Sequence, residues 1–156
     1  MTPDSQLTEL RRQLALAPPP PPGFVGALVM TEAMKKIMEV GGDAVDVPLM
    51  HNFFPGLYQR TVRMNKGTLV VSKIHLTEHP FVIHSGDLSV WTEADGWVRM
   101  TAPFSGVTKP WTVRVLFIHE DTVWSTFHAT SETDVDKIES QIILNPQELC
   151  RMLQQQ

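Results

Sequence analysis

The chain has 156 residues, 42% hydrophobic and 19% charged, a composition typical of one soluble globular domain with its own core. Its net charge of −4, without a basic run, excludes the electrostatic surface expected of a nucleic-acid-binding protein. No apolar run approaches the roughly 20 residues of a transmembrane helix, so no membrane association is expected. The single cysteine excludes an intramolecular disulfide and, with an N-terminus unlike a secretory signal, predicts a cytoplasmic protein.

Two helices are expected before residue 41, with a run of prolines between them. Apolar residues at three- and four-residue spacing predict a helix over residues 4–16, marked by Leu7, Leu10 and Leu14. Pro18 to Pro22 fit neither a helix nor a paired strand, so residues 1–23 are interpreted as a helix followed by a stiff polyproline spacer. This segment is also the candidate contact for a protein partner. A second helix is expected over 24–40.

From Val45 onward the pattern changes to short runs rich in Val, Ile, Thr and Trp, separated by turn residues. Turns are expected at Ser85-Gly86-Asp87 and Glu120-Asp121, among others. Many short strands without helices between them predict a mainly β fold, an antiparallel sandwich or barrel. The domain is placed at 24–140, including its leading helix. The strands are expected at 57–64, 68–75, 80–84, 87–92, 97–102, 112–118 and 122–130.

The C-terminal segment, 141–156, is expected to form a last helix. Asn145 suits the N-cap and Pro146 the first turn, while Glu148 takes the reciprocal position of a capping box. The acidic, polar stretch 131–140 before it is interpreted as the link from the β domain.

Five of the six histidines lie between residues 75 and 128. Imidazole is the commonest protein ligand of transition metals, so a histidine-rich, strand-rich region indicates a candidate metal site. Side chains alternate along a strand, so Lys73 and His75 are expected to face the same side, toward the lumen of a barrel.

The segment from Gly67 to Gly86 resembles the first motif of the cupin superfamily, G-x5-H-x-H-x3,4-E-x6-G. His79 takes the place of the glutamate, His75 that of the second histidine and Lys73 that of the first. In the second motif, G-x5-P-x-G-x2-H-x3-N, Arg114 takes the place of the histidine. Residues 51–140 are also similar to small, uncharacterised cupin-like proteins of phages and prophages, in the phrases at 54–60, 67–75 and 120–130.

This resemblance implies a cupin-like double-stranded β-helix (a jelly-roll barrel) that forms a homodimer, located in the host cytoplasm or the virion if the protein is phage-encoded. It also implies a site in the barrel, with His75, His79 and His128 as candidate ligands of a divalent transition metal such as iron, manganese, nickel or zinc. Two cations at ligand positions oppose a metal, because arginine cannot ligate and lysine offers a charge in place of a lone pair. They suit an anion instead. The candidate ligand-binding residues are Lys73, Arg114, Tyr58 and Arg60.

Two classes of function follow from the sequence. The first is a small cupin-fold protein, an enzyme or a binding protein, that holds a divalent metal, a small anionic ligand or both through His75 and His79. The second is a non-enzymatic structural or interaction protein of phage origin, a virion component or a host-factor binder, that uses the barrel as a scaffold. The first class predicts stoichiometric metal and an activity that is lost in His75→Ala or His79→Ala, whereas the second predicts partner binding that is lost when residues 1–23 are deleted.

Overall fold

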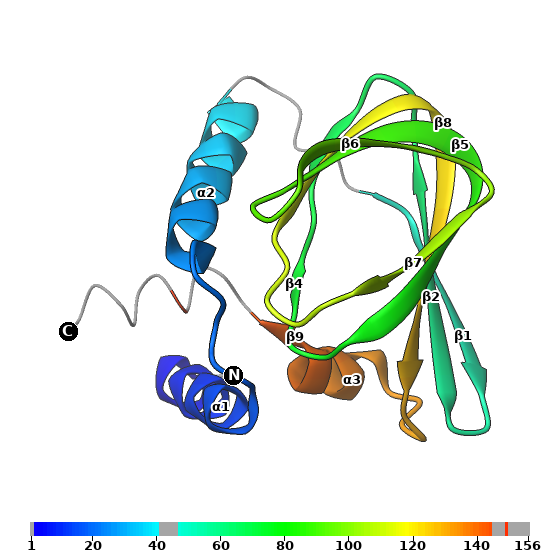
Figure 1. Ribbon diagram of the computed structural model, residues 1–156. Coiled ribbons are helices and arrows are strands. Elements are labelled where there is room, and N and C mark those ends of the chain that lie inside the picture. The colour runs from blue at the N-terminus through cyan, green and yellow to red at the C-terminus, as the bar shows by residue number, and fades with distance from the viewer. Residues whose placement is uncertain (1, 41–46, 145–148, 150–156) are drawn as a thin grey trace.

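The computed structural model describes residues 2–40, 47–144 and 149. Two helices come first, α1 (Pro3–Leu16) and α2 (Phe24–Val40), and a third, α3 (Val135–Ile142), follows the barrel (Figure 1). The strands are β1 (Leu49–Phe54), β2 (Leu57–Met64), β3 (Leu69–Val71), β4 (Ile74–His75), β5 (His79–Thr92), β6 (Gly96–Thr101), β7 (Phe104–Thr108), β8 (Arg114–Ala129) and β9 (Ile143–Leu144). None of the described helices is long and apolar enough to cross a bilayer.

A seven-stranded antiparallel sheet forms the barrel, in the order β1-β2-β8-β5-β6, with β3 paired to β8 and β7 paired to β5. β5 and β8 are long and lie side by side, and each pairs along its two halves with different strands. Because each half of these strands turns toward another partner, the sheet curls on itself, as Figure 1 shows. The mainly β fold with helices at both ends, predicted from the sequence, is confirmed.

Two predicted turns are wrong. Ser85-Gly86-Asp87 lies inside β5, and Glu120-Asp121 lies inside β8. The pairing of β5 with β8 changes register between Ile83 and Leu88, so the turn-forming residues mark an irregularity where both strands bend. Gly86 has φ +111° there and lies against Thr122. β1, β7 and β9 were not predicted, and the expected strand 68–75 is divided into β3 and β4.

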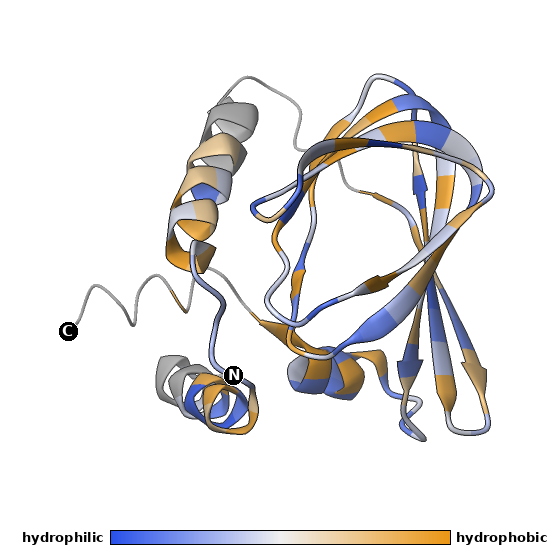
Figure 2. Ribbon diagram, in the orientation of Figure 1, coloured by the Kyte–Doolittle hydropathy of each residue, from blue (hydrophilic) through white to orange (hydrophobic). Residues whose placement is uncertain are grey.

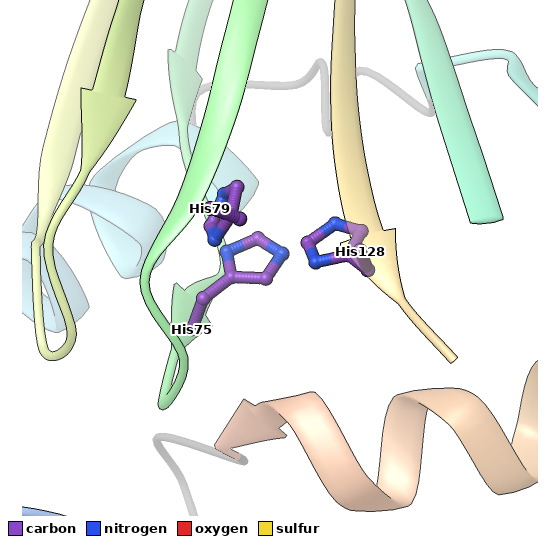
Figure 3. A group of neighbouring side chains, drawn as sticks. All are labelled: His75, His79 and His128. Carbon is purple, nitrogen blue, oxygen red and sulfur yellow. The ribbon is translucent and has the colours of Figure 1, made fainter. Parts of the chain in front are cut away.

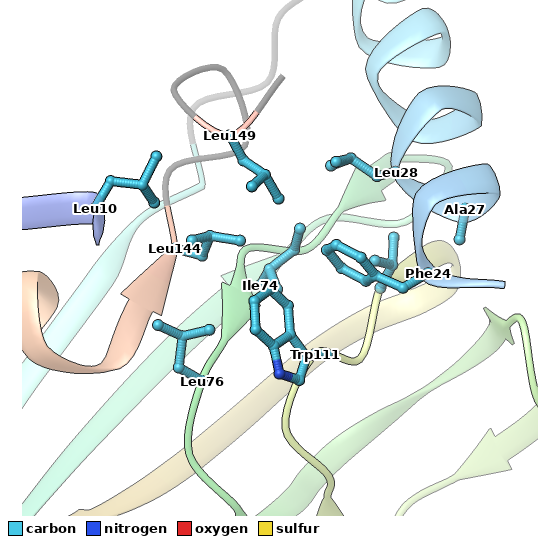
Figure 4. Packing of buried hydrophobic residues seen from close by; sticks show 10 residues of the cluster. Leu10, Phe24, Ala27, Leu28, Ile74, Leu76, Trp111, Leu144 and Leu149 are labelled. Carbon is cyan, nitrogen blue, oxygen red and sulfur yellow. The ribbon is translucent and has the colours of Figure 1, made fainter. Parts of the chain in front are cut away.

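Two apolar clusters hold the barrel and the N-terminal helices together. One fills the barrel, with Phe81, Leu88, Ile118 and Trp124 among its members. The other lies outside the barrel wall, where Leu10 of α1 and Phe24 of α2 meet residues of β4 and the β7–β8 loop, including Trp111 (Figure 4). Figure 2 shows how apolar and polar residues alternate along the strands, which leaves one face of each strand for these clusters.

The proline run lies between two docked helices. The Trp111 indole Nε1 donates a hydrogen bond to the Pro18 carbonyl, 2.7 Å away, and Leu10 is 3% exposed. The expected spacer therefore connects two elements that both pack on the barrel. Thr2 caps α1 by accepting the N–H of Ser5 at 3.2 Å.

The polar stretch interpreted as a link contains most of a helix, α3, that was not predicted from the sequence. α3 begins after Asp134, whose carboxylate accepts the N–H groups of Asp136 and Lys137 at 3.0 and 3.4 Å. β9 follows and pairs with β4, opposite Ile74 and His75. The predicted cap at Asn145, Pro146 and Glu148 lies outside the described residues.

Candidate functional site: three converging histidines

Three histidines from separate parts of the chain meet at one end of the barrel (Figure 3). His75 ends β4, His79 begins β5, and His128 lies near the end of β8. Each offers a ring nitrogen, and these nitrogens all lie within 4.8 Å of one another. The ring centroids of the three pairs are 4.4 to 5.4 Å apart.

Strand pairing explains why His79 and His128 meet. Phe81 of β5 lies opposite Thr126 of β8 in the antiparallel register. His79 is two residues before Phe81 and His128 two residues after Thr126, so both point to the same face of the sheet. His75 reaches this face from β4, which is fixed by its pairing with β9.

Each of the three rings has a nitrogen to which no hydrogen bond is seen among the described residues. His79 donates from Nδ1 to the Thr77 carbonyl at 2.9 Å, so its Nε2 carries a lone pair. His128 has Nε2 3.0 Å from the Thr126 hydroxyl. Nε2 of His75 and Nδ1 of His128 are buried without a hydrogen-bond partner among the described residues. Buried polar atoms usually have a hydrogen-bond partner, so two buried nitrogens without one in the same cluster indicate a binding site for a ligand.

The surroundings keep the rings neutral. Burial, followed by the charges of His79 and His128, lowers the pKa of His75 to about 2. Burial likewise lowers the pKa of His128 to about 3, with His79 the next cause, and it lowers the pKa of His79. A metal competes with protons for imidazole lone pairs, so rings that stay unprotonated across the physiological pH range are suited to ligation.

The geometry fits a transition metal after small movements. A metal–imidazole bond is about 2.0–2.1 Å long, so two nitrogens on one metal can be at most about 4.2 Å apart. The separations here reach no further than 4.8 Å, so small ring rotations bring the three nitrogens onto one centre. Three imidazoles leave further coordination positions for water or a ligand.

Two of the predicted ligand-binding residues lie beside this cluster. Tyr58 is opposite His128 in the β2–β8 pairing and is fully buried, and its ring is tilted against the His128 ring with centroids 5.9 Å apart. Its hydroxyl is hydrogen-bonded to Nδ1 of His51, and burial raises its pKa. Arg60 is 8% exposed, and its guanidinium donates to Glu139 of α3 at 2.8 Å.

Lys73 does not lie in the barrel lumen, contrary to the expectation from strand alternation. Its side chain is 54% exposed and its ammonium group is 3.5 Å from Glu139. The reason is the interruption between β3 and β4 at Ser72 and Lys73, which ends the alternation that would have placed Lys73 beside His75. The site therefore contains one fewer cation than the motif comparison implied.

Arg114 points into the barrel. It donates to the Thr108 hydroxyl at 2.7 Å, and its charge lowers the pKa of both His75 and His79, although it is not the main cause for either. Thr77 and Thr108, which orient His79 and Arg114, were not predicted. Nothing in the sequence marks them, because threonine is common in strands and turns of every kind.

Comparisons with known proteins bear on the fold. The sequence matches no family model and no curated protein. The structure is similar to salicylate 1,2-dioxygenase from Pseudaminobacter salicylatoxidans, with a TM-score of 0.51 and 13% identity over 70% of this chain. The aligned part is 34% of the dioxygenase, so the chain spans about a third of that enzyme.

Two smaller proteins align over most of their own length. A cupin-2 domain protein from Shewanella frigidimarina aligns over 62% of this chain and 92% of its own, with 10% identity and a TM-score of 0.43. A double-stranded β-helix protein from Klebsiella pneumoniae aligns over 59% and 84%, with 11% identity and a TM-score of 0.49. The chain has the fold of the cupin double-stranded β-helix, with helices added at both ends.

Proposed function

We propose that this chain is a small metal-binding protein of cupin fold in which His75, His79 and His128 hold one divalent transition metal. The observation that carries the proposal is the pair of buried, unpartnered nitrogens, Nε2 of His75 and Nδ1 of His128, which lie in one cluster with His79. Iron, manganese, nickel and zinc all accept imidazole ligands. A bound metal would supply a Lewis-acid or oxygen-activating centre.

The residues around the metal site have separate roles in this proposal. The Thr77 carbonyl fixes the proton of His79 on Nδ1, and the Thr126 hydroxyl can accept the Nε2 proton of His128, which would leave Nδ1 of His128 for the metal. Such hydrogen bonds orient ligand rings, and their loss typically weakens metal affinity about 10–100-fold. Tyr58 covers one side of His128 and excludes water from it.

The test is metal content and metal affinity of protein purified without a metal-affinity tag. We expect about one metal ion per chain, and a loss of affinity of more than about 100-fold in His79→Ala and His128→Ala. His84→Ala and His119→Ala are matched controls, because these rings bond Ser125 and Ser89 on other parts of the sheet. Equal metal content in all four variants, or none in the unaltered protein, would contradict the proposal.

A second candidate function, an interaction protein that uses the barrel as scaffold, is favoured by the exposed strand β1. β1 lies at one edge of the sheet, and the side chains of Met50 and Phe54 on it are 50% and 52% exposed. An apolar edge strand can pair with a second copy to form the homodimer that the sequence analysis expected. Met50→Lys should reduce self-association in sedimentation, with Met30→Lys on α2 as control. Unchanged association would exclude β1 as the interface.

A further inference from the structure

A cavity of about 190 Å³ lies in the same barrel, between β5, β6 and β7. It is open to solvent and is lined by Phe81, Val90, Thr92, Asp95, Val98, Met100, Phe104, Gly106, Val107 and Arg114. Its surface combines polar groups with apolar side chains, so it suits a compact molecule that has both a charged group and an apolar body.

Arg114 brings a positive charge into this lining, beside aromatic rings. Its guanidinium carbon is 5.1 Å from the centre of the Phe81 ring and 5.6 Å from that of Trp124. One nitrogen donates to Thr108, whereas Nε is buried without a hydrogen-bond partner among the residues described. Burial is the cause that lowers the pKa of Arg114 to about 10.

Arg60, the other arginine that points into the barrel, shows what Arg114 lacks. Arg60 is paired with Glu139 at 2.8 Å. Arg114 takes part in no ion pair within the described part of the chain. Its side chain is half-buried and its Nε is fully buried, so the guanidinium loses part of its hydration without a compensating charge.

Asp95 also lines the cavity, but it does not neutralise Arg114. It is exposed in the turn between β5 and β6, where its N–H donates to the Thr92 hydroxyl. Its charge is not among the causes of the Arg114 pKa shift, which is due to burial. The guanidinium is therefore available to an anion that enters from solvent.

We infer that this cavity binds a small monocarboxylate, with its carboxylate on the Arg114 guanidinium and its apolar body against Phe81, Val90, Val98 and Met100. The planar fork of a guanidinium matches the two oxygens of a carboxylate. A second negative charge would be buried in the apolar part of the cavity without a partner, which disfavours dicarboxylates and phosphates. Binding at this site does not require the metal.

The ligand would lie next to the three-histidine cluster. Arg114 donates to the hydroxyl of Thr108, and Thr108 lies opposite His79 in the pairing of β5 with β7, so a carboxylate on Arg114 lies toward the same rings. In the metal-bound protein, this arrangement would place the acid beside the metal as its substrate or ligand. The position of the acid beside a metal rests on the proposed function, whereas the binding of a carboxylate to Arg114 does not.

The test is calorimetric titration of the full chain, freed of metal by chelation, with hexanoate and benzoate. The neutral isosteres hexanamide and benzamide are the matched ligands. We expect the acids to bind at least about 10-fold more tightly than the amides, because a hydrogen bond to a charged group is worth about 1.5–3 kcal/mol. No binding of either acid, or equal binding of acids and amides, would overturn the inference.

The Arg114→Met variant tests whether Arg114 binds the ligand or only stabilises the fold. It should reduce acid affinity at least about 10-fold and leave the melting temperature equal or higher, because an uncompensated buried charge is removed. Unchanged affinity in Arg114→Met would contradict the assignment. If that variant does not fold, retained acid binding in the neutral Arg114→Gln would contradict it.

Two further variants test the cavity with Arg114 intact. Val98→Phe, at a partly exposed lining position, should fill the cavity and abolish acid binding, whereas Asp95→Asn should retain it. Retained binding in Val98→Phe would place the ligand elsewhere. Metal content is measured separately on the protein as purified, so a chain that binds the acids but contains no metal before chelation would refute the proposed metal site and leave this inference standing.

Discussion

At the scale of residues, the chemistry of the site depends on how each imidazole is surrounded. Burial is the largest cause of the lowered pKa of His75, His79 and His128. Neutral rings are good ligands, but they also make the folded state sensitive to acid. The unfolded chain binds protons at these histidines near their ordinary pKa of about 6.5, whereas the folded chain does not.

The stability of the metal-free protein should therefore fall as the pH drops below about 6.5. Above that pH the rings are neutral in both states, so they contribute no pH dependence. Below it only the unfolded state gains protons, and each group costs up to about 1.4 kcal/mol per pH unit. The measurement is the urea midpoint from pH 7.5 to 5.

His128→Gln provides the comparison for this pH dependence. Its slope below pH 6.5 should be shallower than that of the unaltered chain, because one group with a pKa near 3 in the folded state is gone. His84→Gln should keep the full slope. Identical slopes in all three proteins would mean that the buried rings are not the origin of the acid sensitivity.

At the scale of elements, the crossing of β5 and β8 decides the shape of the barrel. Gly86 lies where the register of these strands shifts, with φ +111°. A Cβ atom at this position would be 2.6 Å from Cα of Thr122 and 2.7 Å from the Asp121 carbonyl oxygen. Only glycine allows the two backbones to approach so closely.

Gly86→Ala should destabilise the fold by about 4 kcal/mol or more, because it combines an unfavourable φ with a backbone clash. Gly56→Ala is the control: Gly56 also has positive φ, at +72°, but an added Cβ there meets nothing within 4 Å. We expect that variant to lose about 1–2 kcal/mol. Chemical denaturation of both measures the difference, and equal losses would show that the close approach is unimportant.

At the scale of the whole molecule, the N-terminal helices support the strand that carries His75. Ile74, the neighbour of His75, is 2% exposed and belongs to the same cluster as Leu10, Phe24 and Trp111. The backbone N–H of Trp111 donates to the His75 carbonyl at 2.9 Å. Elements far apart in the sequence thus hold one candidate metal ligand in place.

Leu10→Ala should cost about 2–5 kcal/mol, because Leu10 is 3% exposed in this cluster. Leu16→Ala, on the same helix but 76% exposed, should change stability by less than about 0.5 kcal/mol. If the cluster positions His75, the first variant should also bind metal more weakly at a temperature where it is fully folded. Unchanged metal affinity would limit the helices to a stabilising role.

The sequence predicted the type of most elements and the members of the histidine cluster. Periodicity identified both N-terminal helices, and β-rich runs identified β2 and β6 within about one residue. The turns predicted at Gly86 and Asp121 were wrong, because glycine and aspartate also occur where a long strand bends. The sequence of β1 does not alternate between apolar and polar residues, because His51 and Asn52 stand together between apolar pairs. It therefore lacks the pattern by which a strand is recognised.

By itself, the sequence determined a mainly β domain with histidines at a spacing that suits a metal. The tertiary structure decided which cations share the barrel with them. Lys73 pairs at the surface with Glu139, which also neutralises Arg60, whereas the half-buried Arg114 has no acid partner among the described residues. These differences depend on where α3 packs and where β3 ends. Both follow from contacts between distant segments, which local sequence patterns do not encode.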